Sequence, residues 1–385
     1  MERTNAYSLL DFLDNSPCNF FATATIQRYL DDNGFQELKQ SERWNLEKGG
    51  KYYVKKNDTA IFGFVIGETP LDQSGFNMIS AHSDSPCFRI KPNPEMLADG
   101  VLKLNTEVYG GPILYTWFDR PLSLAGRVIV RNPQNPARPI TKLIDFANPV
   151  LIIPHLAIHF NRNVNAGNPL SKQKDMLPIA AIVSDSMSKN NFLIDQIKER
   201  LEIADSKDIL DFDLMLYNCQ KSQLVGFNKE FICSGRIDDL SMAHAALSAL
   251  LNSDNPATTK VMAIFDNEET GSGTKQGAAS PVLASILHRV STCMGLDDEG
   301  FYQALSRSFL VSADNAHAAH PNYPEKYDPT NHPKMGGGPV IKINANCKYM
   351  TDAHSSAIFK EVCHAANVPC QYFVNHSDVA GGSAL

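Results

Sequence analysis

The segment at residues 262–273, with the sequence MAIFDNEETGSG, constrains the fold of this chain more than any other stretch. An apolar run that ends at Phe265 changes abruptly into acidic residues, among them the adjacent Glu268 and Glu269, and then into glycines. This pattern predicts a buried strand that ends in a loop at a sheet edge, where open α/β sheets place their ligand sites. Neighbours on an extended segment point to opposite sides, so the two glutamates are expected to have different roles. One would hold a metal ion and the other would move a proton.

The rest of the chain supplies helices and strands on both sides of this segment. Amphipathic patterns predict helices at residues 6–13, 20–33, 192–204, 240–251, 281–293 and 353–366. Short β-rich runs predict strands at residues 52–55, 60–66, 76–81, 103–109, 122–131, 214–217, 260–265, 309–312, 339–344 and 371–374. Strands that alternate with helices imply a sheet covered on both faces.

Residues 92–232 differ from the rest, because strand-like fragments there alternate with Gly- and Pro-rich turns. We therefore expect an α/β fold, with a mixed-sheet catalytic domain built from residues 1–91 and 233–385. A β-rich insertion, residues 92–232, would separate the two parts of that domain.

Composition excludes several classes of protein. The net charge is −7, which argues against a phosphate-binding surface and hence against a nucleic-acid partner. No stretch is typical of a signal peptide or a membrane span, so no membrane partner is expected and a cytoplasmic location is the default. The eight cysteines are scattered without a C-x-x-C pair, which favours reduced and mostly buried thiols.

Two short polar stretches adjoin predicted elements. His82 and Asp84 share one face of an extended segment, so the carboxylate could orient the imidazole and raise its basicity. The same H-x-D pair is also an ordinary surface feature after a strand. Asp238 and Asp239 directly precede an apolar helix, and one of them would suffice as its cap. The second aspartate then needs another explanation.

Carboxylates and histidines also follow two later strands. The pair Glu268 and Glu269 could be a solvated surface, but it lies between an apolar run and glycines. Asp314 follows the strand predicted at residues 309–312, and His317 and His320 come shortly after it, either as ligands or as exposed loop residues.

Taken together, these stretches predict a metal site. Histidine and carboxylate ligands without thiolates suit zinc, manganese or cobalt, and a catalytic site keeps one position open for water. An aspartate that bridges two metal ions, with a free glutamate beside them, would form a two-metal hydrolase. The metals would activate water, and the glutamate would move its proton.

Seven motifs surround these residues in the order AHSDSPCFRIKP, TEVYGGPILYTWFDRPLSLAGRVIV, IPHLAIHFNRNVN, SGRIDDL, FDNEETGSGTKQGA, SADNAHAAHPNY and GPVIKIN. This set resembles the aspartyl aminopeptidase family of di-zinc exopeptidases, from about residue 6 to the last residue. The resemblance implies two metal ions per subunit, most simply zinc. His82 and Asp314 would hold one metal ion, Glu269 would hold the other, and Asp238 would bridge both.

The resemblance also implies roles for residues that are not ligands. Glu268 would be the general base, and Asp84 would orient His82. In that family the β-rich insertion mediates dimer contacts within a tetrahedral dodecamer, and one of its histidines, matched here by His159, reaches the neighbouring active site. His317 and Lys342 match positions close to bound substrate.

Without the resemblance, two of these matches have ordinary explanations. His159 would be a polar residue in an apolar strand, and Lys342 would be an exposed strand lysine.

The chain departs from the family pattern at its end. Family members continue beyond the SDxxGGS segment, which is residues 377–383 here, and a later element carries the last histidine ligand. Because this chain ends at Leu385, the second metal would have only Asp238 and Glu269, fewer than the three side chains usual at a catalytic zinc. His376 lies nearby but in a different motif. The expectation is a fragment of a longer product or a truncated form with an impaired site.

The predicted function is metal-dependent removal of N-terminal residues from peptides, with the acidic preference inferred from the resemblance. One alternative is a related two-metal exopeptidase that prefers neutral residues. Another is a non-catalytic relative that keeps the fold as an assembly subunit or binding protein. The missing last ligand favours that second alternative, and the retained His82, Asp238 and Glu268 oppose it.

Overall fold

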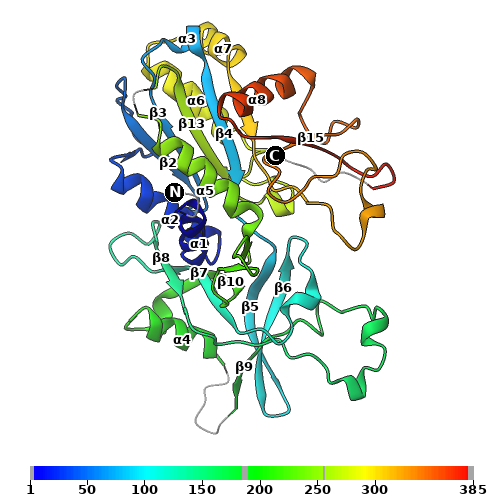
Figure 1. Ribbon diagram of the computed structural model, residues 1–385. Coiled ribbons are helices and arrows are strands. Elements are labelled where there is room, and N and C mark those ends of the chain that lie inside the picture. The colour runs from blue at the N-terminus through cyan, green and yellow to red at the C-terminus, as the bar shows by residue number, and fades with distance from the viewer. Residues whose placement is uncertain (1–3, 184–189, 255, 380–385) are drawn as a thin grey trace. The chain divides into compact units, whose positions relative to one another are not determined.

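Figure 1 shows a computed structural model of the protein, which describes residues 4–183, 190–254 and 256–379. The chain divides into two compact units, Met1–Val311 and Ser312–Leu385. The α-helices of the first unit are α1 (Thr4–Asp14), α2 (Asn19–Asp32), α3 (Leu71–Ser74), α4 (Phe192–Arg200), α5 (Ile237–Leu251), α6 (Val282–Cys293) and α7 (Asp298–Ser306). Within the described residues, no helix is long and apolar enough to cross a membrane.

The first sheet has the strand order β1-β2-β3-β13-β4-β14. Its strands are β1 (Gln36–Glu37), β2 (Lys51–Lys56), β3 (Ala60–Val65), β4 (Phe76–His82), β13 (Thr259–Phe265) and β14 (Phe309–Ser312). Every residue of β3 is buried, as expected for an apolar strand covered on both faces. Helices α1, α2 and α5 share one core with this sheet, centred on residues such as Phe12, Ile26 and Leu247.

The second sheet is antiparallel throughout, in the order β8-β7-β10-β5-β6-β9. Its strands are β5 (Cys87–Ala98), β6 (Val101–Tyr109), β7 (Leu122–Val130), β8 (Ile140–Asp145), β9 (Ile179–Ile182) and β10 (Ile209–Asn218). A separate core that includes Phe88, Leu104 and Leu216 lies against α4 residues. A small pair, β11 (Gln223–Val225) and β12 (Phe231–Cys233), leads back toward α5.

The two sheets of the first unit meet at the start of α2. Phe20 packs there against Ala125 and Met215 of the second sheet. The Arg127 guanidinium lies 4.9 Å from the centre of the Phe20 ring. In Figure 1 this junction lies between the blue helices and the cyan and green strands. The β-rich sheet therefore packs directly against the helices that cover the first sheet.

The pairing of β4 with β13 prepares the functional site. The two strands are parallel, and His82 at the end of β4 is the register partner of Phe265 at the end of β13. Residues that follow parallel strands emerge at the same sheet edge, which is where α/β proteins bind ligands. The segments after His82 and Phe265 are therefore brought side by side.

The second unit contains a short parallel pair, β15 (Val340–Ile343) and β16 (Gln371–Val374), and one α-helix, α8 (Ala353–Ala365). A capping box formed by Asp352 and Ser355 begins α8. Both side chains accept a hydrogen bond from the other's backbone N–H, which satisfies donors that a helix start leaves free.

The α/β class and the main elements agree with the sequence prediction. The hairpin of β2 and β3, the strand β13 and the helix α5 all form where the sequence predicts them. The longest elements that were not predicted are strand β5 and helix α7, and several shorter elements, such as β8, β9 and α3, were also missed. The predicted domain boundaries at residues 92 and 232 stay a prediction.

The prediction for the cysteines was right about pairing and wrong about burial. All eight cysteines are free, but only Cys18 and Cys363 are buried. Cys233 and Cys293 are exposed because each lies at the end of an element, β12 and α6 respectively.

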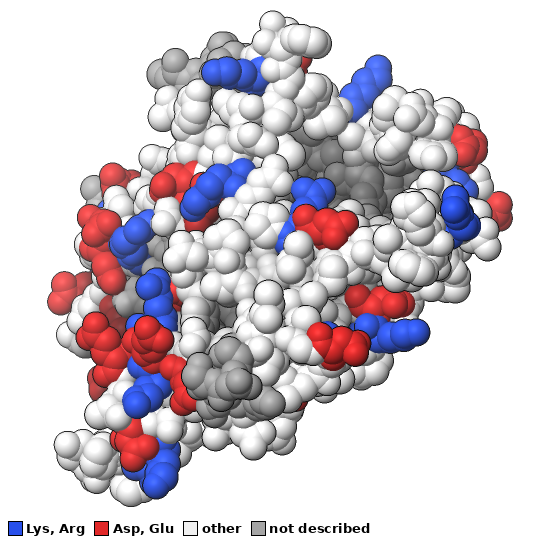
Figure 2. Space-filling view, turned by 90° about the horizontal axis from the view of Figure 1, so that it is seen from below, with Lys and Arg blue, Asp and Glu red and all other residues white. Residues whose placement is uncertain are grey.

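Charged side chains of both signs are interspersed on the face shown in Figure 2, and much of that face carries no charge. No continuous basic area is visible on it. This distribution fits the modest net charge of −7.

Candidate metal centre

His82 and Asp84 form a buried pair at the end of β4. Their relative exposures are 1% and 2%. The Nδ1 atom of His82 lies 3.2 Å from Oδ1 of Asp84 and 3.1 Å from the Asp84 backbone oxygen. The carboxylate thus fixes the ring orientation and leaves Nε2 directed away from it, as expected for a histidine ligand with a carboxylate behind it.

Asp238 and Asp239 both contact His82. The Oδ1 atom of Asp238 lies 3.5 Å from His82 Nε2, and the Asp238 side chain is 56% exposed. The buried Asp239 carboxylate accepts the backbone N–H of His82 at 3.1 Å. The peptide bond between the two aspartates is cis, and both have non-helical dihedral angles.

The two aspartates lie at a kink inside helix α5. The residue at the N-cap position of the whole helix is Arg236, which makes no side-chain cap hydrogen bond. The second aspartate has its own partner, the backbone of β4. No site role was predicted for Asp239, and the only signal in the sequence was its place beside Asp238.

Glu268 and Glu269 lie on a short 3-10 helix, η5 (Glu268–Thr270), and not on the extended segment that was predicted. Asn267, with φ of 64°, turns the chain at the end of the strand. As a result, ligand atoms of both glutamates and of His82 lie within 4.8 Å of one another. The Oε2 atom of Glu268 is 3.8 Å from His82 Nε2.

Asp84 holds this turn in place. Its Oδ1 accepts the backbone N–H of Glu268 and its Oδ2 accepts that of Glu269, both at 3.2 Å. One buried carboxylate therefore contacts both the imidazole of His82 and the turn that carries the glutamates. Burial opposes its charge, but hydrogen bonds from His82 and Tyr109 hold the pKa of Asp84 below its usual value.

The electrostatics of the cluster favour a cation. Burial by itself lowers the pKa of His82, but hydrogen bonds to Asp238 and Asp84 and the charge of Asp239 raise it to about 11. Burial raises the pKa of Glu269 to about 7, and Asp238 adds to the rise. The rise at His82 reflects the carboxylates around its ring, whereas the rise at Glu269 is mainly an effect of burial.

The donor set fits zinc. Among the described residues of the first unit, two groups of possible ligands share His82: one with Asp238 and Asp239, the other with Glu268 and Glu269. An imidazole and carboxylates, without thiolates, are ligands typical of a catalytic zinc. His82, Asp238 and Glu269 have the chemistry needed to hold such ions.

The remaining predicted site residues belong to other segments of the chain. In the second unit, Oδ2 of Asp314 accepts from Nζ of Lys342 at 2.8 Å, and the two side chains are 17% and 14% exposed. His317 is exposed in the loop after β14. His159 is exposed in the short helix η2 (Ile158–Phe160) of the first unit. The predicted roles of these residues stay predictions.

A cavity of about 420 Å³ borders the cluster within the first unit. Asp84 and Asp238 line its end at the metal centre, and Trp117 and Met215 of the β-rich region supply apolar walls. The cavity thus combines a few polar groups with an apolar lining, as ligand sites usually do.

The family described as Aminopeptidase I zinc metalloprotease (M18) matches residues 12–385. The chain belongs to this M18 family of zinc aminopeptidases. The "Probable M18 family aminopeptidase 2" of Clostridium novyi is 51% identical to this M18 aminopeptidase over 381 residues, which are 99% of this chain and 88% of the relative.

Solved structures agree with the family assignment. A chain in the cryo-EM structure of the Ape4 and Nbr1 complex has a TM-score of 0.94 and 35% identity, covering 99% of this chain and 77% of that one. The mApe1 dodecamer of S. cerevisiae has a TM-score of 0.84 and 25% identity, covering 97% and 85%. The predicted family, fold class and enzyme class, a metallo-aminopeptidase, are therefore confirmed.

Proposed function

We propose that this M18 aminopeptidase releases N-terminal acidic residues from peptides at a site for two metal ions, most simply zinc. One observation carries the proposal. At the sheet edge where β4 and β13 end, ligand atoms of His82 lie within 4.8 Å of those of Asp238 in one group and of Glu268 and Glu269 in another. Such a cluster of mixed imidazole and carboxylate donors is typical of two-metal hydrolases.

Each side chain has a distinct place in the proposed reaction. His82 and Asp314 would hold one ion and Glu269 the other, while Asp238, whose side chain is the most exposed of the cluster in the first unit, would bridge them. Bound zinc supplies Lewis acidity, which lowers the pKa of water and polarises a carbonyl. Asp84 would keep the His82 ring in its orientation through the contact at Nδ1.

Glu268 is the proposed proton carrier. Its carboxylate lies beside the cluster, 3.8 Å from His82 Nε2, on a turn that Asp84 fixes through the backbone. It would take a proton from the attacking water and return it to the leaving amine. General acid–base catalysis of this kind contributes roughly 10²–10⁴-fold to a rate.

The acidic preference depends on a cation near the scissile residue, and Lys342 is the proposed one. Its side chain is mostly buried, which is unusual for lysine. His317, in the same unit, is proposed to contact substrate as well.

One observation favours the alternative of a neutral-residue preference. The Lys342 ammonium already pairs with Asp314 at 2.8 Å and donates to the Asn315 backbone oxygen at 2.9 Å. A cation neutralised in this way attracts a substrate carboxylate less strongly.

Activity on aspartyl, glutamyl and leucyl amides, before and after chelation and after zinc is restored, tests the proposal. We expect activity that is lost on chelation and regained with zinc, with aspartyl and glutamyl amides turned over fastest. Lys342→Met should lower kcat/KM for the acidic amides much more than for the leucyl amide. Faster turnover of the leucyl amide would establish the neutral alternative, and activity that survives complete removal of metal would refute the metal mechanism.

We also propose that the predicted β-rich insertion, residues 92–232, mediates self-association of the subunit, up to a dodecamer. Around the exposed His159, the side chains of Leu156, Ile158 and Phe160 are 57%, 47% and 81% exposed. A cluster of exposed apolar side chains is a feature of protein–protein contact sites. The mApe1 relative is a dodecamer, which supports the same assembly here. A cytoplasmic location stays a prediction.

A further inference from the structure

Tyr109, the last residue of β6, connects the β-rich sheet to the metal centre. Its hydroxyl donates to Oδ2 of Asp84 at 2.7 Å and accepts from Nδ2 of Asn267 at 2.8 Å. Asp84 contacts His82, and Asn267 begins the turn that carries Glu268. One hydroxyl from the second sheet therefore touches both segments that follow β4 and β13.

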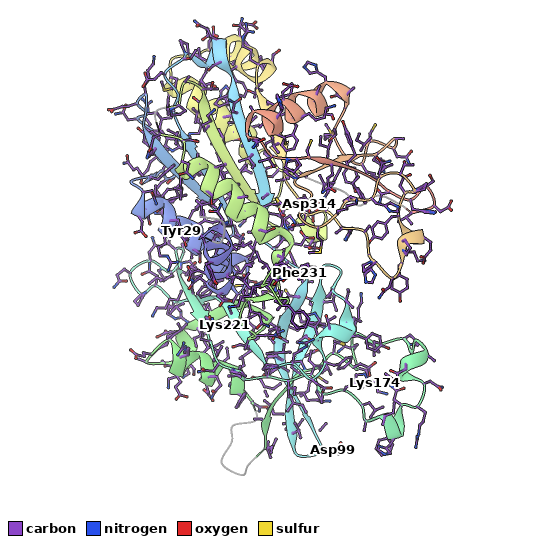
Figure 3. All side chains as sticks on the ribbon, viewed as in Figure 1. Tyr29, Asp99, Lys174, Lys221, Phe231 and Asp314 are labelled. Carbon is purple, nitrogen blue, oxygen red and sulfur yellow. The ribbon has the colours of Figure 1, made fainter. Side chains whose placement is uncertain are left out.

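Strand β6, which ends at Tyr109, runs along the length of the second sheet. Asp99, labelled in Figure 3, lies in the turn before β6 at the far end of that sheet. From there the nine residues of β6 run back to the junction with the first sheet. The end of β6 at Tyr109 therefore lies in the candidate site.

The next residue adds a second contact with the same turn. Gly110 has φ of 69°, and a Cβ atom there would lie 3.1 Å from the Cβ of Glu269. The backbone after Tyr109 therefore packs directly against the side chain proposed to hold a metal ion. Two neighbouring residues of the β-rich sheet thus limit where Asp84 and Glu269 can lie.

The hydrogen-bond network around Tyr109 extends behind the turn. Asn267 also receives a hydrogen bond from Nε2 of Gln276 at 2.9 Å, and the buried Asp266 receives one from Nδ2 of Asn19 at 3.0 Å. These contacts fix Asn267 from the side of the first sheet. Tyr109 supplies the constraint from the opposite side.

We propose that Tyr109 is a positioning residue, through which the β-rich sheet sets the geometry of Asp84 and of the turn that carries Glu268 and Glu269. The sheet is then a part of the catalytic centre in each subunit, in addition to its proposed role in self-association. This inference rests on the proposed metal-binding and proton-transfer roles of His82, Glu268 and Glu269.

The test compares Tyr109→Phe with Tyr53→Phe. Tyr53, in β2 of the first sheet, donates to Oδ1 of Asp31 at 2.8 Å and so offers a matched tyrosine–carboxylate hydrogen bond, and it does not line the cavity beside the cluster. Residues that orient ligands from behind typically contribute on the order of 10–100-fold to metal affinity or activity. We expect Tyr109→Phe to lower kcat and zinc affinity within that range and to leave KM nearly unchanged. Tyr53→Phe should match the parent protein in all three.

A second pair of variants covers the case in which Tyr109→Phe folds poorly. Gly110→Ala adds a Cβ against Glu269, whereas Gly100→Ala adds one in open space at a comparable φ of 77°. Both substitutions introduce the strain of a positive φ, so this strain cancels in the comparison. Only Gly110→Ala should lower kcat and zinc affinity. Competition with a chelator measures the zinc affinity. Thermal denaturation of each variant reports its folding.

The inference is overturned if Tyr109→Phe has the same kcat and zinc affinity as its control and Gly110→Ala has the same values as Gly100→Ala. Glu268→Gln, measured beside them, separates this failure from failure of the proposed function. If Glu268→Gln abolishes turnover while Tyr109→Phe equals the parent, only the positioning role is wrong. If Glu268→Gln retains full turnover, the proposed mechanism is wrong, and the positioning role that rests on it falls too.

Discussion

At the scale of single residues, the site is organised around one imidazole. His82 has Asp84 on its Nδ1 side, Asp238 and Glu268 on its Nε2 side, and Asp239 on its backbone N–H. Carboxylates packed this closely repel each other unless a cation lies among them. Without a metal ion, repulsion between these carboxylates would destabilise the folded state. The arrangement is therefore explained better as a metal site than as a purely structural cluster.

Asp239 should contribute to stability through its backbone contact. Asp239→Ala leaves the buried N–H of His82 without a partner, which costs roughly 1–3 kcal/mol. Asp239→Asn keeps an acceptor at this position and should lose less. Urea denaturation of both variants, freed of metal, measures the difference. Equal stability of the two variants would show that the hydrogen bond at 3.1 Å contributes nothing.

At the scale of elements, the sequence predicted those strands and helices whose signal lies in neighbouring residues. The apolar runs of β3, β4 and β13 and the abrupt acidic ending of β13 pointed to the sheet edge where His82 and the two glutamates lie. His82 and Asp84 met because two residues on an extended segment share a face.

Elements were missed where tertiary contacts override local signals. Strand β5 contains Pro92 and Pro94, which normally exclude a strand. Its register with β6 shifts between Ile90 and Glu95, so an irregularity accommodates both prolines. Tyr109 could not be recognised as a neighbour of Asp84, since 25 residues separate them and only the packing of one sheet on the other brings them together.

Helix α5 should make the stability of the protein depend on pH through His244. Its ring contacts Phe12 of α1 and hydrogen-bonds with Ser8, and burial lowers its pKa from the ordinary value of 6.5. A lowered pKa means that the folded state binds the proton less well than the unfolded state. Stability from the neutral ring is therefore complete above pH 6.5 and decreases as the pH falls through the lower folded-state pKa.

Urea denaturation at pH 7.5 and at pH 5 measures this effect. The parent protein should lose more stability between the two values than His244→Gln, which has no ionisable group at this position. If the two proteins respond equally to pH, the contact of α1 with α5 does not depend on the charge of His244.

At the scale of the whole molecule, the β-rich region has two proposed roles, one in self-association and one inside the site. Exposed apolar side chains near His159 are proposed to serve the first, and Tyr109 at the end of β6 is proposed to serve the second. Because these residues lie on different elements, η2 and β6, the two roles can be tested separately.

Phe160→Asp should weaken self-association and leave zinc binding intact. Phe160 is 81% exposed within one subunit, so the substitution should not disturb the subunit core, but a charge buried in an interface is unfavourable. Light scattering during size-exclusion chromatography measures the mass. Asn163→Asp, a charge change in the same loop, is the control. An unchanged assembly in Phe160→Asp would place the contact surface elsewhere.

The most direct test of the account is the zinc content and turnover of Glu268→Gln. Glu268 is the proposed proton carrier and its neighbour Glu269 the proposed metal ligand, although both lie on one turn beside His82. We therefore expect Glu268→Gln to retain the zinc content of the parent protein and to lose nearly all turnover. Loss of zinc on this substitution would reverse the roles of the two glutamates, and full turnover would contradict the mechanism.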